Sequence, residues 1–557
     1  MKKLIYLTVF IAITLTAKAQ QTVGLFTQNP GSLDGYVLFS PIPSDTTYLI
    51  DKCGYKVHSW WSNNHPGQSV YLLEDGTLLR PGAINNMTFN GGGRGGVVEK
   101  FDWNSNLLWS YTISSSTECQ HHDVRQLPNG NVLAIVWELK TAAQALAGGR
   151  NPANIGTVVW SEKIVELQQT GLNMANIVWE WHVWDHLVQD YDSTKSNFGI
   201  VSEHPELINF NYTNGSPTAS DWLHCNALDY NEALDQIILS SHNFCEMWII
   251  DHSTSTAESA SHNGGNHGRG GDLMYRWGNP AAYNRGTAND QKFYGQHNLR
   301  WIPDGFPGEG SILVYNNGLS RPGGNYSTVE TFVTPIDTAG EYPIAINQPY
   351  LPLASNWVYT APTPTSFFSQ VISGAQRLSN GNTIICEGTK GNFFEIDSAS
   401  TIVWQYVSAV AQNGTVSQGT TPTMNSVFRC TYYEVNYPGL NGQVLTPGDP
   451  IELNPLAYSC NMLSTGIQES KQLDHAVVHV GNPFRNLLQI FTETDLIRAT
   501  ALLTDMEGRI VDRFQDINLY AGNSLSLELN TDLTIGIYYL TINSTDKKFN
   551  MKLIHQN

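Results

Sequence analysis

The sequence has few charged residues for its length, and the basic ones are the scarcer kind. Of its 557 residues only 14% are charged, and 30 Lys and Arg stand against 49 Asp and Glu, for a formal charge of -19. Binding nucleic acid requires a basic face that neutralises phosphates, so this balance argues against nucleic acid as a partner. The 48 glycines and the 11% aromatic content are typical of a large all-β protein with many turns.

Long apolar runs are also missing, except at the start of the chain. Lys2 and Lys3 precede an apolar run at 4–15, and the Ala-Lys-Ala at 17–19 has the form of a signal peptidase site. We therefore expect residues 1–19 to be a signal peptide. No later stretch approaches the ~18 apolar residues of a membrane helix, so we expect an exported protein with no integral membrane segment in its mature chain.

Cysteine is sparse, with seven residues and no CxxC pair. An odd number scattered over this length does not indicate a disulfide framework. Cys225 and Cys245 are the first pair we would expect to bond. The alternative, buried free thiols, has equal weight.

What the sequence does contain is a repeat. An aromatic-rich strand, a variable loop and a strand with a tight turn recur six times between about residues 40 and 450, in units of roughly 65–70 residues. The turns have the form Glu-Asp-Gly, Pro-Asn-Gly, Pro-Asp-Gly or Ser-Asn-Gly, which supply the positive φ that a hairpin needs. Sheets that cannot bury their own faces close into a ring, so we predict a β-propeller with six blades, seven being the alternative count.

The composition changes near residue 463. Residues 463–472 are polar and patternless, and residues 473–557 alternate polar and apolar in short segments, which predicts a small antiparallel sandwich. The predicted fold is therefore all-β: a signal peptide, a six-bladed β-propeller over 20–462, a linker over 463–472, and a small antiparallel β-sandwich over 473–557.

Histidine is the main chemical signal. Eleven of the sixteen histidines fall between residues 121 and 297. When the repeats are aligned, His122, His224 and His297 each lie eight residues before the same slot of the turn that follows. Equivalent positions of neighbouring blades lie at one height and radius, so we expect these three imidazoles to converge. His121 does not align, and we expect it to point the other way on its strand.

Converging imidazoles without an aligned carboxylate fit three interpretations. One is a metal site, because neutral histidine is the commonest transition-metal ligand. Another is nucleophilic catalysis in which histidines also stabilise a developing anion. The third is a polar plug in the propeller channel. The equivalent positions of two further repeats are also polar, Gln68 and Ser373.

Residues ~40–450 resemble the bacterial arylsulfotransferases that work without the nucleotide donor PAPS. The shared motifs are His121-His122-Asp123 before Leu-Pro-Asn-Gly-Asn, His224-Cys225-Asn226, Ser240-Ser241, Gln296-His297, and Asn316-Asn317-Gly318. The resemblance implies a six-bladed propeller in which His297 takes a sulfuryl group from an aryl sulfate and passes it to a phenol. It further implies that His122, His224 and Asn226 hold the sulfuryl and bridging oxygens, with no cofactor.

One position departs from the family pattern. His242 follows Ser240-Ser241 where the family carries Arg. A guanidinium is always charged and binds sulfate with a fork of donors, whereas the charge of a histidine depends on pH. Either another arginine (Arg321 or Arg429) supplies the charge, or the substrate differs.

The last ~85 residues resemble the type A sorting domain of the type IX secretion system. The shared residues are Gly481-Asn482-Pro483-Phe484, Asp505-Met506-Glu507-Gly508-Arg509 and Gly536-Ile537-Tyr538-Tyr539, before a lysine-containing end. The resemblance implies a secreted or cell-surface protein that is exported through the periplasm and handled by that machinery.

The sequence thus predicts an arylsulfotransferase whose partners are an aryl sulfate and a phenol, with His297, His122, His224, Asn226 and His242 at its site. Two alternatives stay open. One is a non-catalytic propeller that binds ligands at the cell surface, and the other is a metallohydrolase that uses His122, His224 and His297 as ligands.

Overall fold

Short strands follow one another along nearly the whole chain, as the alternation in the sequence predicts. The computed structural model describes residues 20–456, 460 and 478–555, the last range without 481–483, 493–494, 506–508, 530–532 and 545–547. The expected signal peptide (1–19) and linker (463–472) lie outside the described residues. The chain divides into two compact units, residues 1–463 and 464–557.

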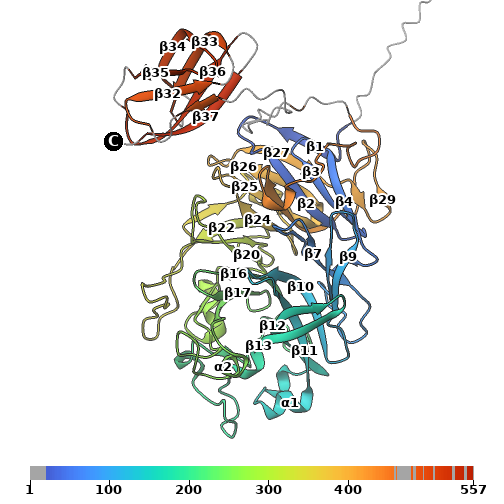
Figure 1. Cartoon of the computed structure of the whole chain (residues 1–557). Coiled ribbons are helices and arrows are strands. Elements are labelled where there is room, and N and C mark those ends of the chain that lie inside the picture. The colour runs from blue at the N-terminus through green and yellow to red at the C-terminus, as the bar shows by residue number, and fades with distance from the viewer. Residues whose placement is uncertain are drawn as a thin grey trace, which may run out of the picture. The chain divides into compact units, whose positions relative to one another are not determined.

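Six antiparallel sheets of four or five strands make up most of the first unit (Figure 1). One sheet consists of β5 (His65–Pro66), β7 (Leu78–Ala83), β8 (Gly96–Phe101) and β9 (Leu107–Thr112), and β6 (Tyr71–Leu72) also pairs with β7. The next consists of β10 (Glu118–Gln126), β11 (Val132–Thr141), β12 (Val158–Gly171) and β13 (Met174–His182). The third consists of β16 (Cys225–Asn231), β17 (Gln236–Ser241), β18 (Glu246–Asp251) and β19 (Tyr275–Trp277).

Of the other three sheets, the first is formed by consecutive strands, and the other two pair strands from distant parts of the chain. They consist of β20 (His297–Trp301), β21 (Ile312–Asn316), β22 (Thr328–Phe332) and β23 (Trp357–Tyr359); β24 (Gly374–Arg377), β25 (Thr383–Glu387), β26 (Asn392–Ile396), β27 (Ile402–Val407) and β1 (Gly24–Gln28); and β30 (Val427–Glu434), β2 (Gly35–Pro41), β3 (Thr46–Asp51) and β4 (Lys56–Trp61). Two-stranded pairs join β14 (Leu187–Val188) to β15 (Ile208–Asn209) and β28 (Val410–Ala411) to β29 (Gly414–Thr415).

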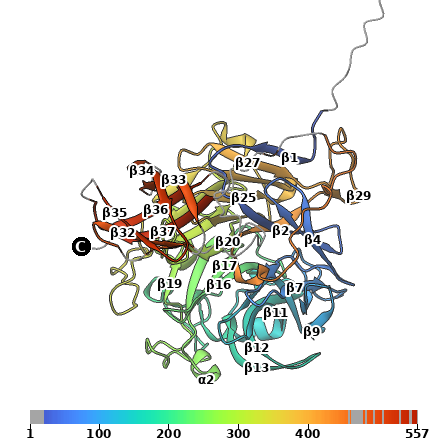
Figure 2. The same ribbon diagram turned by 45° about the horizontal axis from the view of Figure 1, so that its top comes forward.

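We call β6, β10, β16, β20, β24 and β30 the first strands of the six sheets, and those of successive sheets lie beside one another. β10 lies beside β16, β16 beside β20, β20 beside β24, and β24 beside β30. Tyr71 of β6 bonds through its hydroxyl with both Asp123 of β10 and Arg429 of β30. Figure 2 shows β16, β20 and β2 nearer the middle of this unit than β9, β13 and β19, which end their sheets.

The predicted turns follow these first strands, and their glycines have the required conformation. The N–H of Gly130 donates to the carbonyl of Leu127 at 2.9 Å with φ +85°, and that of Gly381 donates to Leu378 at 2.9 Å with φ +90°. A side chain at such a position would be strained, which is why glycine recurs there. Each first strand therefore has its turn at one end and the aligned histidine position at the other.

The bond expected between Cys225 and Cys245 is wrong, and the alternative of buried free thiols is confirmed for both. Cys225 and Cys245 are buried free thiols, and the disulfide in the described residues joins Cys53 to Cys460. In the β16–β17 ladder the residue opposite Cys225 is Ser241, and Cys245 comes only after the next turn. The disulfide closes a loop of 407 residues between the β3–β4 turn and the end of the first unit.

The second unit contains two antiparallel sheets. One consists of β31 (Val478–Val480), β32 (Leu487–Thr492) and β35 (Ser524–Glu528), and the other of β34 (Ile510–Leu519), β33 (Leu496–Thr504), β36 (Gly536–Asn543) and β37 (Lys548–His555). Alternate apolar residues of both sheets, such as Leu488, Ile490, Leu503 and Leu540, are buried in one cluster.

Helices are scarce in the described residues. The α-helices there are α1 (Ala142–Ala147) and α2 (Thr256–Ser259), each begun by a capping box. None of the described helices has the length and apolar character that crossing a membrane requires.

Candidate active site

Four histidines from three neighbouring sheets come together at the start of the first strands. The ring centroids of His122 and His224 lie 4.7 Å apart, those of His224 and His242 5.3 Å, and those of His242 and His297 5.4 Å. The ring of Phe428, on β30, lies 5.9 Å from His122 and 6.3 Å from His297. The five rings thus form a closed circuit of neighbours, which we call the histidine cluster.

An unusual backbone conformation brings the aligned positions inward. Residues 68, 122, 224 and 373, equivalent in the repeat alignment, all have positive φ: Gln68 at 99°, His122 at 53°, His224 at 50° and Ser373 at 88°. In the fourth sheet the positive φ is at Asn298, one residue after His297. The ladder register shifts at the same place in the β10–β11, β16–β17 and β20–β21 pairs. Bulges of this kind re-aim side chains, which explains why the histidines leave the regular strand alternation.

Gly93 allows His122 to occupy its place. A Cβ atom on Gly93 would lie 1.9 Å from Cε1 of the His122 ring, and its φ of +81° favours glycine independently. The N–H of His122 also donates to the carbonyl of Gly93 at 2.8 Å. The glycine-rich loop therefore packs directly against one imidazole of the cluster.

The surroundings of His297 fix which of its nitrogens carries the proton. Its Nδ1 lies 2.8 Å from Oδ1 of Asn317 and 3.1 Å from the carbonyl of Gly295. Asn317 directs its Nδ2 at the carbonyls of Ser369 and Ile372, so its oxygen must face the ring. Nδ1–H therefore donates, and Nε2 keeps a lone pair, which accepts from the N–H of Ile372 at 3.1 Å. Burial holds the pKa of His297 well below the ordinary value, so the ring is neutral.

His224 has the opposite electrostatic setting. Its Nδ1 lies 2.5 Å from Oδ2 of Asp221. Burial opposes protonation, but the charge of the carboxylate and its hydrogen bond outweigh burial and raise the pKa of His224 above its ordinary value. His224 is therefore the cationic member of the cluster.

Behind His122 lies a chain of three hydrogen-bonding groups. Nδ1 of His122 is 2.8 Å from Nδ1 of His121, and Nε2 of His121 is 2.7 Å from Oε2 of Glu162. Burial, with the nearby charge of Asp221, raises the pKa of Glu162 well above its ordinary value, while burial lowers the pKa of both histidines. A protonated Glu162 donates to His121, which donates to His122, leaving Nε2–H of His122 as a donor.

These contacts correct one expectation. His121 does not point away, because the left-handed residue at 122 breaks the alternation and the two rings meet, while the ring centroids of His121 and Trp137 are 3.9 Å apart. No carboxylate occupies an aligned repeat position, but Asp221 and Glu162, which lie outside the alignment, bond to His224 and His121.

His242 is neutral and presents an acceptor. Its Nδ1 lies 2.8 Å from Oδ1 of Asn243, whose Nδ2 donates to the carbonyl of Asp221. Burial, followed by the charge of His224, lowers the pKa of His242 to about 4. With Nδ1–H donating, Nε2 has a lone pair and cannot bind an anionic oxygen as a guanidinium does.

The two arginines considered as substitutes for the family arginine have other contacts. Arg429 bonds to Asp123 and to the hydroxyl of Tyr71 through Nη1, both at 2.9 Å. Arg321 donates to Thr328 and lies over the rings of Tyr294 and Tyr326. Arg429 also lies over the ring of Phe428, 4.6 Å from its centroid, so it contacts the cluster from behind that ring. Among the four histidines themselves, the cation is His224.

Asn226 does not join the rings in the contacts of the structure. Its Nδ2 donates to the carbonyl of Gln296 at 2.8 Å, which ties β16 to the residue before His297. Its Oδ1 is buried without a hydrogen-bond partner among the described residues. The structure therefore brings His122, His224, His242 and His297 together, with Asn226 beneath them as a link between strands.

A different set of side chains has the spacing of a metal site. Among the described residues these are His186, His262 and Asp272, whose ligand atoms lie within 4.8 Å of one another. His186 and His262 both contact Oδ1 of Asp272 at 2.8 Å through Nδ1.

The sequence reasoning missed five residues of this site: Asp221, Glu162, His121, Asn317 and Phe428. Asp221 could have been found, because it precedes His224 by only three residues, and Asn317 lies within the Asn316-Asn317-Gly318 motif. Glu162 and Phe428 come from strands β12 and β30, whose proximity to the histidines only the folded chain reveals.

Comparison with known proteins defines the class. The family model described as "Arylsulfotransferase (ASST)" matches residues 44–432, which is more than half of the chain. The chain therefore belongs to the arylsulfotransferase family. The model for the secretion system C-terminal sorting domain matches residues 481–556, so the tail is a type IX sorting domain and the protein is exported to the cell surface or the medium.

No curated protein matches the chain. Similar solved structures include a protein of unknown function from Bacteroides caccae, 11% identical over 72% of this chain and 99% of that one, with a TM-score of 0.39. A catalytically inactive virginiamycin B lyase from Staphylococcus aureus is 9% identical over 70% of this chain and 89% of that one, with a TM-score of 0.32. At these values the likeness carries no argument about function.

Proposed function

We propose that the protein moves a sulfuryl group from an aryl sulfate ester to a phenol through a sulfohistidine on His297, without a nucleotide. The observation that carries the proposal is the pairing of a neutral His297, whose Nε2 has the lone pair, with a cationic His224 in the same cluster. A neutral imidazole is a nucleophile, and a neighbouring cation stabilises the anionic group that it attacks.

In the first step the lone pair of His297 Nε2 forms a bond to sulfur as the bond between sulfur and the aryl oxygen breaks. The hydrogen bond from the N–H of Ile372 must be released for this attack. The leaving phenolate takes the proton from Nε2–H of His122. His122 is reprotonated at Nδ1 by His121, and Glu162 supplies the proton to His121.

In the second step a phenol attacks sulfur and the bond between nitrogen and sulfur breaks, returning the electron pair to His297. The phenolic proton travels back through His122 and His121 to Glu162. The phenol hydroxyl donates to Nε2 of His122, while the neutral His242, whose ring centroid lies 5.4 Å from that of His297, helps to position the acceptor. His224 holds the charge of the transferring group in both steps, as positioned charges do in phosphoryl transfer.

The proposal includes the architecture expected from the sequence. The six sheets form a six-bladed β-propeller, supported by the succession of neighbouring first strands from β6 to β30. The tail over 473–557 forms a small sandwich that follows a linker, and a signal peptide over 1–19 directs passage through the periplasm. His122, His224, His242 and His297 act in catalysis, and Asn226 positions the strand of His297.

The experiment is to incubate the purified protein with 4-nitrophenyl sulfate and measure intact mass before and after adding a phenol. We expect the gain of one sulfuryl group, localised to His297 by fragmentation, and its loss when the phenol is added. His297→Ala should abolish both the adduct and nitrophenolate release, while His204→Ala, at a half-exposed histidine outside the cluster, should leave both unchanged. Saturable binding without turnover in the unaltered protein would favour the non-catalytic ligand-binding alternative.

A further inference from the structure

The ends of the first strands opposite the histidine cluster surround a cavity. Its volume is about 930 Å³, and its lining comes from β6, β10, β16, β20, β24 and β30 and the turns that follow them. Arg125 and Arg300 line it, and each lies three residues beyond a cluster histidine, which is roughly 10 Å along a strand. This cavity is therefore separate from the proposed reaction site.

The charges between the cavity and the histidine cluster do not balance. Nη1 of Arg429 lies 2.9 Å from Asp123, and Nη2 of Arg125 lies 3.2 Å from Asp229. Arg300 has no carboxylate partner among the described residues, and its Nε is buried without a hydrogen bond. A guanidinium stays charged in proteins. Three arginines thus face two aspartates, and Arg300 is the one left without an ion pair on the floor of the cavity.

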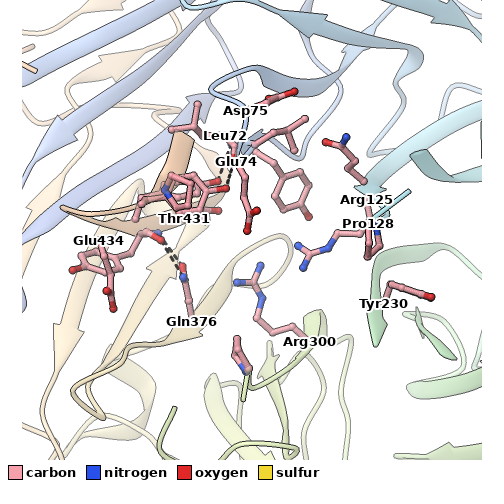
Figure 3. Close-up of a pocket in the computed structure, with 18 of the residues that line it drawn as sticks. Leu72, Glu74, Asp75, Arg125, Pro128, Tyr230, Arg300, Gln376, Thr431 and Glu434 are labelled. Carbon is pink, nitrogen blue, oxygen red and sulfur yellow. Dashed lines mark hydrogen bonds between the residues drawn. The ribbon is translucent and has the colours of Figure 1, made fainter. Parts of the chain in front are cut away.

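Figure 3 shows the side chains of Arg125 and Arg300 extending into the same space, with Glu74 reaching toward it from the turn after β6. In addition to Glu74, three further carboxylates line the cavity: Asp75, Glu232 and Glu434. These carboxylates repel a ligand with several negative charges, but the arginines on the floor of the cavity can bind a ligand with a single negative charge.

The walls of the cavity are aromatic. The tyrosines that line it are Tyr71, Tyr230, Tyr432, Tyr433 and Tyr437. Their hydroxyls already bond within the protein: for example Tyr71 donates to Asp123, Tyr433 accepts from Leu72 and Tyr437 donates to Leu72. The walls therefore contribute ring surface, which packs against a planar apolar body.

We propose that this cavity binds a small ligand with a single anionic group on an aromatic body, such as an aryl carboxylate. The unpaired guanidinium of Arg300 binds the anionic group, and the tyrosine rings pack against the aromatic body. The surrounding carboxylates exclude polyanions. The inference does not depend on the proposed sulfuryl transfer, because a carboxylate is not a sulfuryl donor.

The test is calorimetric titration of benzoate into the full chain. We expect binding with a Kd of about 1 mM or below, and a loss of about tenfold or more in affinity in Arg300→Gln. Benzamide, which lacks the charge, and cyclohexanecarboxylate, which lacks the ring, should each bind more weakly than benzoate. Inorganic triphosphate should not bind at this site.

Three further variants distinguish binding in this cavity from binding at the histidine cluster or elsewhere on the surface. Glu74→Gln, at an exposed residue, should tighten benzoate binding by about twofold at low salt because it removes a repelling charge. Arg285→Gln, away from the cavity, and His297→Ala should bind as the unaltered protein does. Absence of benzoate binding, unchanged affinity in Arg300→Gln, or loss of binding in His297→Ala would each overturn the proposal.

Discussion

The charge of His224 depends on Asp221, so Asp221→Asn should change the pH dependence of sulfuryl transfer. The proposed active form has His297 neutral and His224 protonated. Burial lowers the pKa of His297, and Asp221 raises the pKa of His224. Activity should therefore rise as pH increases through the pKa of His297 and fall as it passes the raised pKa of His224, which gives a bell-shaped profile.

The magnitude follows from the contact between the two groups. The distance of 2.5 Å joins side chains that are only 19% and 21% exposed, so solvent screens the interaction incompletely. A hydrogen bond to a charged group of this kind contributes about 1.5–3 kcal/mol, which corresponds to roughly one to two pKa units. In Asp221→Asn the pKa of His224 falls, and the alkaline limb of the profile should move down by about one to two pH units.

The assay is kcat/KM for 4-nitrophenyl sulfate from pH 5 to 10, with a saturating phenol. Asp235→Asn is the matched control, because Asp235 makes a 2.8 Å bond to Nδ1 of His252 outside the cluster. The acid limb, which reports His297, should stay near its original position in both variants. An alkaline limb that stays in place in Asp221→Asn, or moves equally in Asp235→Asn, would refute the reasoning.

Three further predictions address the groups around the cluster. Glu162→Gln should lower kcat/KM for the donor, which reports the first step, at least tenfold for esters of unactivated phenols but little for 4-nitrophenyl sulfate, whose leaving group needs no proton. Equal effects on both donors would exclude Glu162 as the proton source. Gly93→Ala should lower kcat at least tenfold and also reduce Tm, because its Cβ meets the ring of His122 at 1.9 Å; unchanged kinetics would show that the loop moves freely. Cys53→Ser should lower the free energy of unfolding by about 2–5 kcal/mol in urea titrations, since the disulfide closes a 407-residue loop, and a smaller loss would show that the loop is already constrained.

The sequence predicted those parts of the fold that depend on short-range geometry. A tight turn that requires positive φ favours glycine, so the turns at Gly130 and Gly381 could be predicted from the sequence. Both glycines adopt that conformation in the structure. The pairing of β1 with β27 and of β30 with β2 was not readable, because each joins segments hundreds of residues apart. The Cys53–Cys460 disulfide was missed for the same reason.

At the site, the sequence predicted what repeats along the chain and missed what depends on irregular backbone. His122, His224 and His297 were found because equivalent positions of a repeat have equivalent surroundings. His121 was misjudged because strand alternation fails at a left-handed residue. Glu162 lies on the third strand of its sheet, 41 residues from His121, and no spacing rule connects the two.

These contacts explain what the replacement of the family arginine by His242 does to the charge of the site. His242 is neutral because it is buried next to the charged His224, so it cannot restore the missing positive charge. That charge resides instead on His224, and it persists only while Asp221 keeps the imidazole protonated. An arginine would bind sulfate at any pH, whereas this cluster loses its affinity for the sulfuryl group once the pH passes the raised pKa of His224. Installing the family residue as His242→Arg should therefore lower the pKa of His224 by like-charge repulsion, yet flatten the alkaline limb, because a permanent cation then binds the sulfuryl group. An alkaline limb that keeps its steepness in this variant would mean that His224 does more than supply charge.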